Sequence, residues 1–371
     1  MQFQNAICCI LGKILKRIEL VITAAPRLFF HGSTQQKQIR NCIRFIVCIL
    51  VLCCCVFTAT ARSIPQQSPG KSVALRTFDD TIPGLQIKQD QSGKKNSRLW
   101  LVAGSHAAIW GGTFVALNSA WYKGYPKSSF HFFDDRKEWN QIDKLGHIWT
   151  AYQLSRHSAE TWRWAGADRR RSAWLGAGSA FAFQSIIEIL DGFSEEWGFS
   201  VGDMEANLIG SGGYLAQELL FNSQIFQVKM GYKPYNYPPE LKQRRNQLFG
   251  FTLPEQILKD YNSQRYWLGA GVSKIFSAAP PWLNIAIGFS SDGMYGGHGN
   301  TWTNAQGIVF DRSDIKRVRR FYLAPDIDLT KIKTGSNFLR SVFFILNMVK
   351  IPAPALEYNS RGKFRLHALM F

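Results

Sequence analysis

The sequence predicts an α+β protein with an N-terminal bundle of about four helices followed by a mainly antiparallel β C-terminal region. Two observations support this prediction. Residues 99–225 have helical periodicity and many small residues, which favour close packing between helices. From about residue 226 onward, apolar and polar residues alternate, as they do in strands with one face buried.

The first 98 residues have the composition of export and linker segments. We predict that residues 1–61 are a leader and signal peptide, because basic Lys37, Arg40 and Arg44 precede an apolar run that ends before Ala59-Thr60-Ala61, a small-x-small cleavage pattern. An uncleaved anchor is the alternative, although the apolar run is short for a membrane span. Residues 62–98 are rich in Ser, Gln, Lys, Gly and Pro and predict a flexible linker.

The composition favours a membrane lipid surface as a partner and argues against nucleic acid. The formal net charge is +18, but the basic residues are scattered and no nucleic-acid-binding motif accompanies them. Anionic lipid headgroups would balance this charge. All cysteines lie at or before Cys55, so the remainder of the chain has no disulfide and no thiolate metal site. The sequence identifies no protein partner.

The first two predicted helices differ in character. Residues 99–122 carry no formal charge and are long enough either to cross a membrane or to lie inside a bundle. The second helix is predicted at about 138–157. The charged residues at 156–171 indicate an exposed connection to the next helix.

The third and fourth helices have clearer ends. The third is predicted at about 172–190, with Gly192 as the expected stop. The fourth begins at Ser200 or Asp203, whose spacing resembles a capping arrangement, and continues to about residue 221. Three glycines on this helix indicate close neighbours: Gly210, Gly212 and Gly213.

The region 226–371 is predicted to hold roughly five strands and one helix. The predicted strands cover residues 266–276, 282–289, 320–329 and 364–370, and the helix covers 336–349. In the strand at 320–329, Phe321 and Leu323 fall on one face and Tyr322 and Asp326 on the other. We expect this sheet either to pack on the helices or to rest against a membrane boundary.

Three helices carry polar pairs spaced four residues apart, which places both members of each pair on one helix face. Because buried polar groups require partners, these pairs predict one shared polar cluster inside the bundle. The predicted cluster comprises Asp143, Lys144, His147, Gln184, Glu188, Asp191, Asp203 and Asn207.

The cluster has three possible roles. It could be a structural network in which the acids are satisfied by Lys144 and His147. It could perform acid–base chemistry, with His147 moving a proton and Glu188 or Asp203 orienting it. It could also bind a divalent metal through Asp143, His147, Glu188 and Asp203, although no metal or other cofactor is expected from a defined motif.

Residues 192–200 form an aromatic, glycine-bearing loop beside the cluster. It could be a lid that dips into lipid, or a compact connection whose aromatics close the end of the bundle. The chain has no Walker loop, G-x-S-x-G, H-E-x-x-H or dinucleotide glycine pattern. Their absence argues against the common hydrolases, NTPases and dehydrogenases.

The motifs around the cluster resemble domain-of-unknown-function family 2279, a family of predicted periplasmic lipoproteins. The resemblance covers about residues 99–225 and depends on Asp143-Lys144-x-x-His147, Glu188-x-x-Asp191-Gly192 and Trp197-Gly198-Phe199-Ser200-x-x-Asp203-x-x-x-Asn207. Downstream motifs resemble longer members from Bacteroidetes-type bacteria. A fainter similarity is to the VanZ-like membrane family, which would imply a lipid-embedded bundle. This chain lacks a lipobox, because Leu52 directly precedes Cys53.

We therefore expect an exported bacterial envelope protein, periplasmic or associated with the outer membrane after signal-peptide cleavage. The first hypothesis for its function is a non-enzymatic, membrane-associated role in envelope structure or maintenance. The alternative is an interfacial enzyme that acts on a lipid or peptidoglycan precursor, with His147, Glu188 and Asp203 as catalytic residues.

Overall fold

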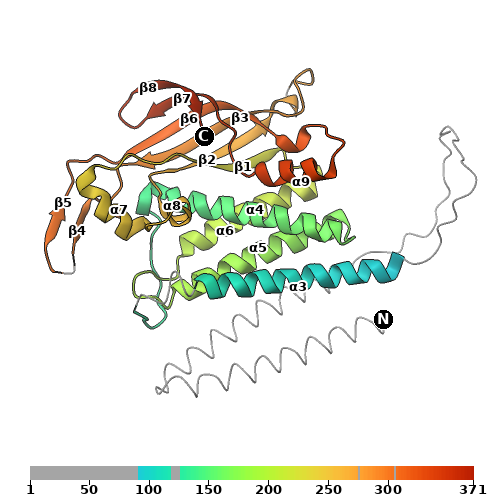
Figure 1. Ribbon diagram of the computed structural model, residues 1–371, viewed down its shortest axis with the longest axis horizontal. Coiled ribbons are helices and arrows are strands. Elements are labelled where there is room, and N and C mark those ends of the chain that lie inside the picture. The colour runs from blue at the N-terminus through green and yellow to red at the C-terminus, as the bar shows by residue number, and fades with distance from the viewer. Residues whose placement is uncertain (1–90, 118–125, 275, 305) are drawn as a thin grey trace, which may run out of the picture. The chain divides into compact units, whose positions relative to one another are not determined.

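The computed structural model describes residues 91–117, 126–274, 276–304 and 306–371 (Figure 1). Contacts between residues divide the chain into two compact units, one ending at Phe130 and the other beginning at His131. The predicted leader and signal peptide at 1–61 lie outside the described residues, as does the linker up to residue 90.

The described part of the first unit is mainly helix α3, Gln91–Leu117. The sequence predicted this helix at 99–122, so its start was placed too late, and assigning residues 91–98 to a flexible linker was wrong. That segment contains lysine, arginine and glutamine, which have good helix propensity and can extend an apolar helix into polar sequence. Its predicted end lies outside the described residues.

The second unit begins with three long helices, α4 (Ile142–Trp164), α5 (Arg169–Asp191) and α6 (Val201–Phe221). The prediction of an exposed connection at 156–171 was wrong, because α4 continues to Trp164. Arg156, which suggested an exposed segment, is buried: its guanidinium lies 3.9 Å from the centre of the Phe344 ring and donates to the Phe344 carbonyl. A charged residue can therefore lie inside this helix face when its charge has a partner.

The ends of α5 and α6 agree with their capping residues. Asp168 accepts a hydrogen bond from the backbone of Arg171 at the start of α5, and Gly192 follows its last residue as predicted. Ser200 caps α6 by accepting from the backbone of Asp203 at 3.0 Å. Such caps satisfy backbone N–H groups that have no partner within the helix.

Glycine allows α4 to approach both neighbouring helices closely. A Cβ added to Gly176 of α5 would collide with the backbone of Ser155, and one added to Gly210 of α6 would collide with the carbonyl of Ile148. The prediction of close neighbours was therefore correct for Gly210. It was not confirmed for Gly212 and Gly213, because no atom of the described residues lies within 4 Å of a Cβ at either position.

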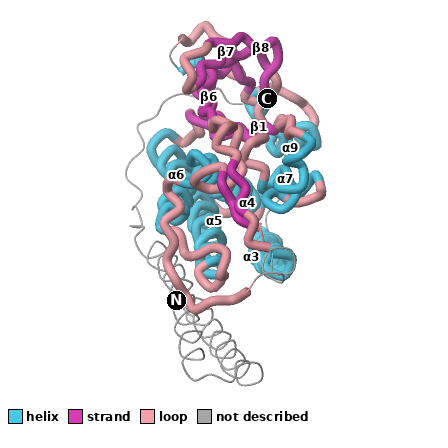
Figure 2. The backbone as a smooth tube through the Cα atoms, turned by 90° about the vertical axis from the view of Figure 1, so that its left-hand side faces the viewer, coloured by secondary structure: helices cyan, strands magenta, loops and turns pink. Residues whose placement is uncertain are grey.

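A six-stranded antiparallel sheet follows, in the order β1-β2-β3-β6-β7-β8. Figures 1 and 2 show this sheet on one side of the three helices, with α4 nearest to it and β7 and β8 at the end away from α5. The strands are β1 (Phe226–Tyr232), β2 (Gln264–Gly271), β3 (Leu283–Asp292), β6 (Val318–Ile327), β7 (Ala353–Asn359) and β8 (Phe364–Met370). The predicted α+β class is therefore confirmed in its sheet and in the helices that precede it.

Several elements were not predicted. Strands β1 and β7 were missed, as was the small pair β4 (Thr301–Thr303) and β5 (Val309–Asp311). The prediction of a single helix in this half was also wrong, because α7 (Lys242–Phe249) and α8 (Leu253–Lys259) precede α9 (Asn337–Leu346). Helices α7 and α8 are short and have no long apolar period.

The two faces of the sheet have unexpected polarity. The alternation predicted in β6 is present, but Phe321 and Leu323 are 47% and 46% exposed whereas Tyr322 and Asp326 are buried. The buried face holds a core of Trp267, Ala286, Tyr322, Ala324, Ala355 and Met370. Much of the aliphatic face therefore lies on the outside.

The buried face also holds charges. The ammonium of Lys229 lies 2.8 Å from Asp326 Oδ2, and that of Lys350 lies 3.5 Å from Asp326 Oδ1; all three residues are almost inaccessible. Strands β1 and β8 are the two edges of the sheet, and they approach each other. Phe371, which follows β8, lies with its backbone against Gly231 of β1, and its carbonyl accepts from the indole N–H of Trp267. The sheet is therefore strongly curved around a filled interior.

Among the described residues, α5 is the helix whose length and apolar composition would allow it to cross a membrane. Half of its most apolar stretch is buried within the protein, and it contributes the buried polar residues Gln184 and Glu188. These properties are equally typical of a core helix.

Candidate functional site

The centre of the predicted cluster is the ammonium group of Lys144. This nitrogen lies 2.7 Å from Asp135, 2.9 Å from Asp143 and 2.6 Å from Asp203. Three carboxyl groups thus contact one partly buried cation, and their residues come from the segment before α4, from α4 itself and from α6. The sequence placed Asp143, Lys144 and Asp203 together but did not include Asp135.

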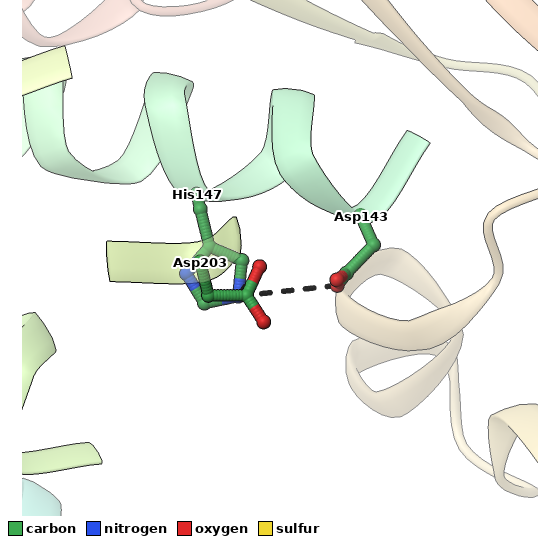
Figure 3. A group of neighbouring side chains, drawn as sticks. All are labelled: Asp143, His147 and Asp203. Atoms are coloured by element: carbon green, nitrogen blue, oxygen red, sulfur yellow. Dashed lines mark ion pairs between the residues drawn. The ribbon is translucent and has the colours of Figure 1, made fainter. Parts of the chain in front are cut away.

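His147 lies one helical turn after Asp143 and faces both neighbouring helices. Its Nδ1 donates to the side-chain carbonyl of Asn207 at 3.1 Å and is 3.6 Å from Glu188 Oε1. Its Nε2 lies 3.4 Å from Asp203 and 3.9 Å from Asp143. Figure 3 shows Asp143, His147 and Asp203 directed into the same space beside α4.

Helix α5 completes the cluster. The amide of Gln184 donates to Asn207 Oδ1 at 3.2 Å, and Glu188 lies on the same helix face one turn later. Asp191 ends α5, and its charge is one cause of the raised pKa of Glu188. The eight predicted residues therefore lie around one region, with Lys144 and His147 contacting residues from different elements.

Two further residues belong to the site although the sequence did not assign them to it. Asp135 accepts a hydrogen bond from the hydroxyl of Ser200, the residue that caps α6. Tyr261 donates its hydroxyl to Asp143 at 2.7 Å. Both lie outside the predicted helices and have no periodic signal, so only the tertiary contacts reveal them.

The pKa values of the carboxyl groups in the cluster are shifted in opposite directions. Burial, reinforced by the charge of Asp143, raises the pKa of Asp203 to about 9. Burial also raises the pKa of Glu188 well above its ordinary value, with Asp203 adding to the effect. Burial opposes ionisation of Asp143 as well, but the nearby His147, Lys144 and Tyr261 outweigh it and hold that pKa below its usual value.

The ion pairs also stabilise the charged form of Lys144. Burial alone would lower the pKa of its ammonium, but Asp143 and Asp203 outweigh burial and raise that pKa above its ordinary value. The site therefore favours a charged Lys144 and an ionised Asp143, whereas burial favours the protonated forms of Asp203 and Glu188. Keeping two acids protonated reduces the repulsion among buried carboxylates.

Two buried polar atoms in the cluster have no hydrogen-bond partner among the residues that the structure describes. They are Oε1 of Glu188 and Nδ2 of Asn207, and both side chains are almost completely inaccessible. The side chains of His147 and Asp143 are 21% and 18% exposed. The site thus has a closed inner end and an outer end in contact with solvent.

Metal binding is geometrically possible for part of the cluster. One ligand atom from each of Asp143, His147 and Asp203 lies within 4.8 Å of the others, whereas Glu188 is not part of this group. Lys144, however, already contacts both carboxylates. A divalent cation would have to displace this ammonium or share the carboxylates with it.

The loop at 192–200 is tied to the segment before α4. The backbone N–H of His131 donates to the carbonyl of Gly192, and His131 and Phe133 exchange further backbone hydrogen bonds with Phe199. A Cβ at Gly198 would collide with Phe133. These contacts support the hypothesis of a compact connection over that of a lid.

Residues 131–218 match the model of domain-of-unknown-function family 2279, described as a predicted periplasmic lipoprotein. The match includes all eight predicted cluster residues and indicates an exported protein of the bacterial envelope. No match was found among curated proteins or among solved structures. The comparisons do not extend the resemblance to the VanZ-like family or to Bacteroidetes-type members.

Proposed function

We propose that this protein is a membrane-associated envelope protein with a structural or maintenance role, in which the polar cluster fixes the arrangement of its helices. The observation that supports this proposal is the position of the Lys144 ammonium between Asp135, Asp143 and Asp203. One cation joins three segments of the chain, and Tyr261 and Asn207 add further hydrogen bonds. A network of this kind specifies one packing of the bundle.

The network explains why acids are present in a helical core. An isolated buried carboxylate would be costly, but Asp135, Asp143 and Asp203 contact Lys144, and burial favours the protonated form of Glu188. The cluster also lacks a nucleophilic serine, threonine or cysteine among the residues assigned to it. The non-enzymatic role thus requires no group beyond those described.

A second candidate is an enzyme that acts on a lipid or peptidoglycan precursor. The observation that favours it is the pairing of protonated acids with an accessible imidazole: Asp203 has a pKa of about 9 and lies 3.4 Å from His147 Nε2. In this mechanism His147 accepts a proton from a bound substrate, and Glu188 or Asp203 supplies one to the leaving group.

Two substitutions separate these candidates: His147→Ala and Glu188→Gln in a strain that lacks the chromosomal gene. For the structural role we expect envelope integrity, measured as survival in detergent, to fall in proportion to the melting temperature and cellular amount of each variant. A variant with wild-type stability and amount but no rescue of survival would support the enzyme. Glu205→Gln, which changes a half-exposed acid on α6, is the matched control.

Two further measurements test whether the cluster binds a metal and whether the protein is associated with a membrane. We expect purified protein to contain no stoichiometric divalent ion, because Lys144 neutralises the carboxylates; a stoichiometric ion would overturn this interpretation. We also expect the protein to sediment with the membrane fraction. Complete release by osmotic shock without detergent would overturn membrane association.

A further inference from the structure

The outward face of the sheet carries aligned rows of apolar side chains. The strand register places one residue from each strand in an aliphatic row of Val228, Leu268, Ile287, Leu323, Leu356 and Leu366. From Leu268 to Leu366 every member of this row is at least 43% exposed, and the exposed fraction is 61% at Ile287 and 77% at Leu366. The side chains on the solvent-facing side of a sheet are normally polar. A face that is apolar across six strands therefore indicates a binding surface for a partner.

A second, aromatic row lies beside the first. Phe289, Phe321, Tyr358 and Phe364 follow one another across β3, β6, β7 and β8. The rings of Phe289 and Phe321 are 5.2 Å apart, and those of Tyr358 and Phe364 are 4.9 Å apart. Phe364 is nevertheless 70% exposed. The two rows together form what we call the outer sheet face.

The helices cover only one end of this face. At that end, Ile142 of α4 packs with Met230 and Tyr266, and Phe289 lies against the same core. Helix α4 makes its sheet contacts with β1 and β2, and no described helix packs extensively on β6, β7 or β8. Figures 1 and 2 both show β7 and β8 extending away from the helices. The remaining outer sheet face is uncovered within the described residues.

The charge around the uncovered part indicates the nature of its partner. The turn between β7 and β8 exposes Arg361 and Lys363, and Arg365 follows on β8. The acid of these two strands, Glu357, is buried and paired with Arg320 and His367. The exposed charges of the hairpin are therefore all positive. Arg361 and Lys363 lie in the turn that leads into Phe364 of the aromatic row, as in segments that bind at an anionic lipid interface, whereas Arg365 lies opposite Glu357 on the other face of the sheet.

We propose that the outer sheet face binds the surface of an anionic lipid bilayer, with the leucine and isoleucine side chains in the acyl boundary and the aromatic row at headgroup level. Arg361 and Lys363 then contact lipid phosphates. The inference rests on the proposed membrane association and identifies the surface responsible. A second copy of the chain fits less well, because it would bring the same positive hairpins and the same net charge together.

Co-sedimentation of the full chain with vesicles tests this assignment. The probes are vesicles of phosphatidylcholine alone and vesicles containing phosphatidylglycerol as the anionic lipid. We expect the wild type to bind the anionic vesicles at least about tenfold more tightly than the neutral ones. The double variant Phe364→Gln/Leu366→Gln should lower binding to anionic vesicles by at least about tenfold. Arg361→Gln/Lys363→Gln should remove most of the preference for the anionic lipid.

The matched control changes two similarly exposed apolar residues on α6, Leu208→Gln/Ile209→Gln. Binding that survives the sheet substitutions but is lost in this control would overturn the outer sheet face while leaving membrane association intact. No binding of the wild type to either vesicle would overturn both proposals. Loss of a wild-type dimer in the sheet variant, measured by analytical ultracentrifugation without lipid, would assign the face to a second copy instead. Thermal melts verify that each variant is folded.

Discussion

The ammonium nitrogen of Lys144 lies 2.6 Å from Asp203 Oδ1 and joins α4 to α6. The same nitrogen contacts Asp135 and Asp143. We expect Lys144→Met to lower the free energy of unfolding by about 3–5 kcal/mol, because it leaves buried carboxyl groups without their cation. Urea unfolding measures the change.

Lys137→Met is the control for that substitution, since Lys137 is exposed. Its effect should remain within about 0.5 kcal/mol. Equal stability of both variants and the wild type would contradict a central role for the ion network.

The raised pKa of Asp203 predicts how stability depends on pH. Its pKa is about 9 in the folded protein and near 4 in an unfolded chain. Between these values the folded state binds a proton that the unfolded state releases, so the free energy of unfolding falls as pH rises. Each such group contributes up to about 1.4 kcal/mol per pH unit.

Asp203→Asn cannot titrate and should therefore flatten the pH dependence of unfolding between about pH 5 and 8. Part of the slope should persist, because the pKa of Glu188 is also raised. Urea midpoints across this pH range provide the measurement, with Glu205→Gln as the control. An unchanged slope in Asp203→Asn would show that Asp203 is already ionised in the folded protein.

Two glycines on α6 provide a matched test of helix packing. Gly210→Ala should destabilise the protein by about 1–3 kcal/mol, because the added methyl group collides with Ile148 and Ala151. In Gly213→Ala the added methyl group meets no atom of the described part of the chain within 4 Å, so this change should instead stabilise the helix by up to about 1 kcal/mol. Melting temperatures of the two variants should shift in opposite directions. Equal shifts would disprove the close approach of α4 and α6.

The ion pair inside the sheet should also be sensitive to substitution. Asp326→Asn removes the partner of Lys229 and Lys350, both almost fully buried. We expect a loss of about 3–5 kcal/mol, because an ammonium is then left in an apolar interior. Asp314→Asn, on an exposed side chain, is the control and should change stability little. A mild effect of Asp326→Asn would indicate that these lysines are neutral when the protein is folded.

The helical part of the fold was largely predictable because its signals are local. The i, i+4 polar pairs located α4, α5 and α6, and Ser200 and Gly192 marked helix ends. Prediction failed where tertiary contacts reverse a local preference. The charge of Arg156 suggested an exposed loop, yet its guanidinium contacts the Phe344 ring and donates to the Phe344 carbonyl inside the protein.

The site was predictable to the same extent. Residues on one helix share a face at known spacing, which placed Asp143 with His147. The need of buried polar groups for partners then predicted that Asp203 of the next polar pair would meet them. Asp135 and Tyr261 come from segments outside the helices and strands, where the position of a residue in the sequence does not predict where its side chain points. Alternation in β6 likewise predicted which residues share a face. It could not tell which face is buried, because Asp326 is satisfied by two lysines from other strands and loops.

That interior charge has a consequence for strand alignment. If β6 slipped by one residue against β3, Pro325 or Ile327 would replace Asp326 opposite the ammonium groups, and both cations would lose their counter-ion. The same slip would turn Phe321 and Leu323 toward the interior and Tyr322 outward, because successive side chains point to opposite faces of a strand. The buried ion pairs of Asp326 with Lys229 and Lys350 therefore help to fix a single register between β3 and β6.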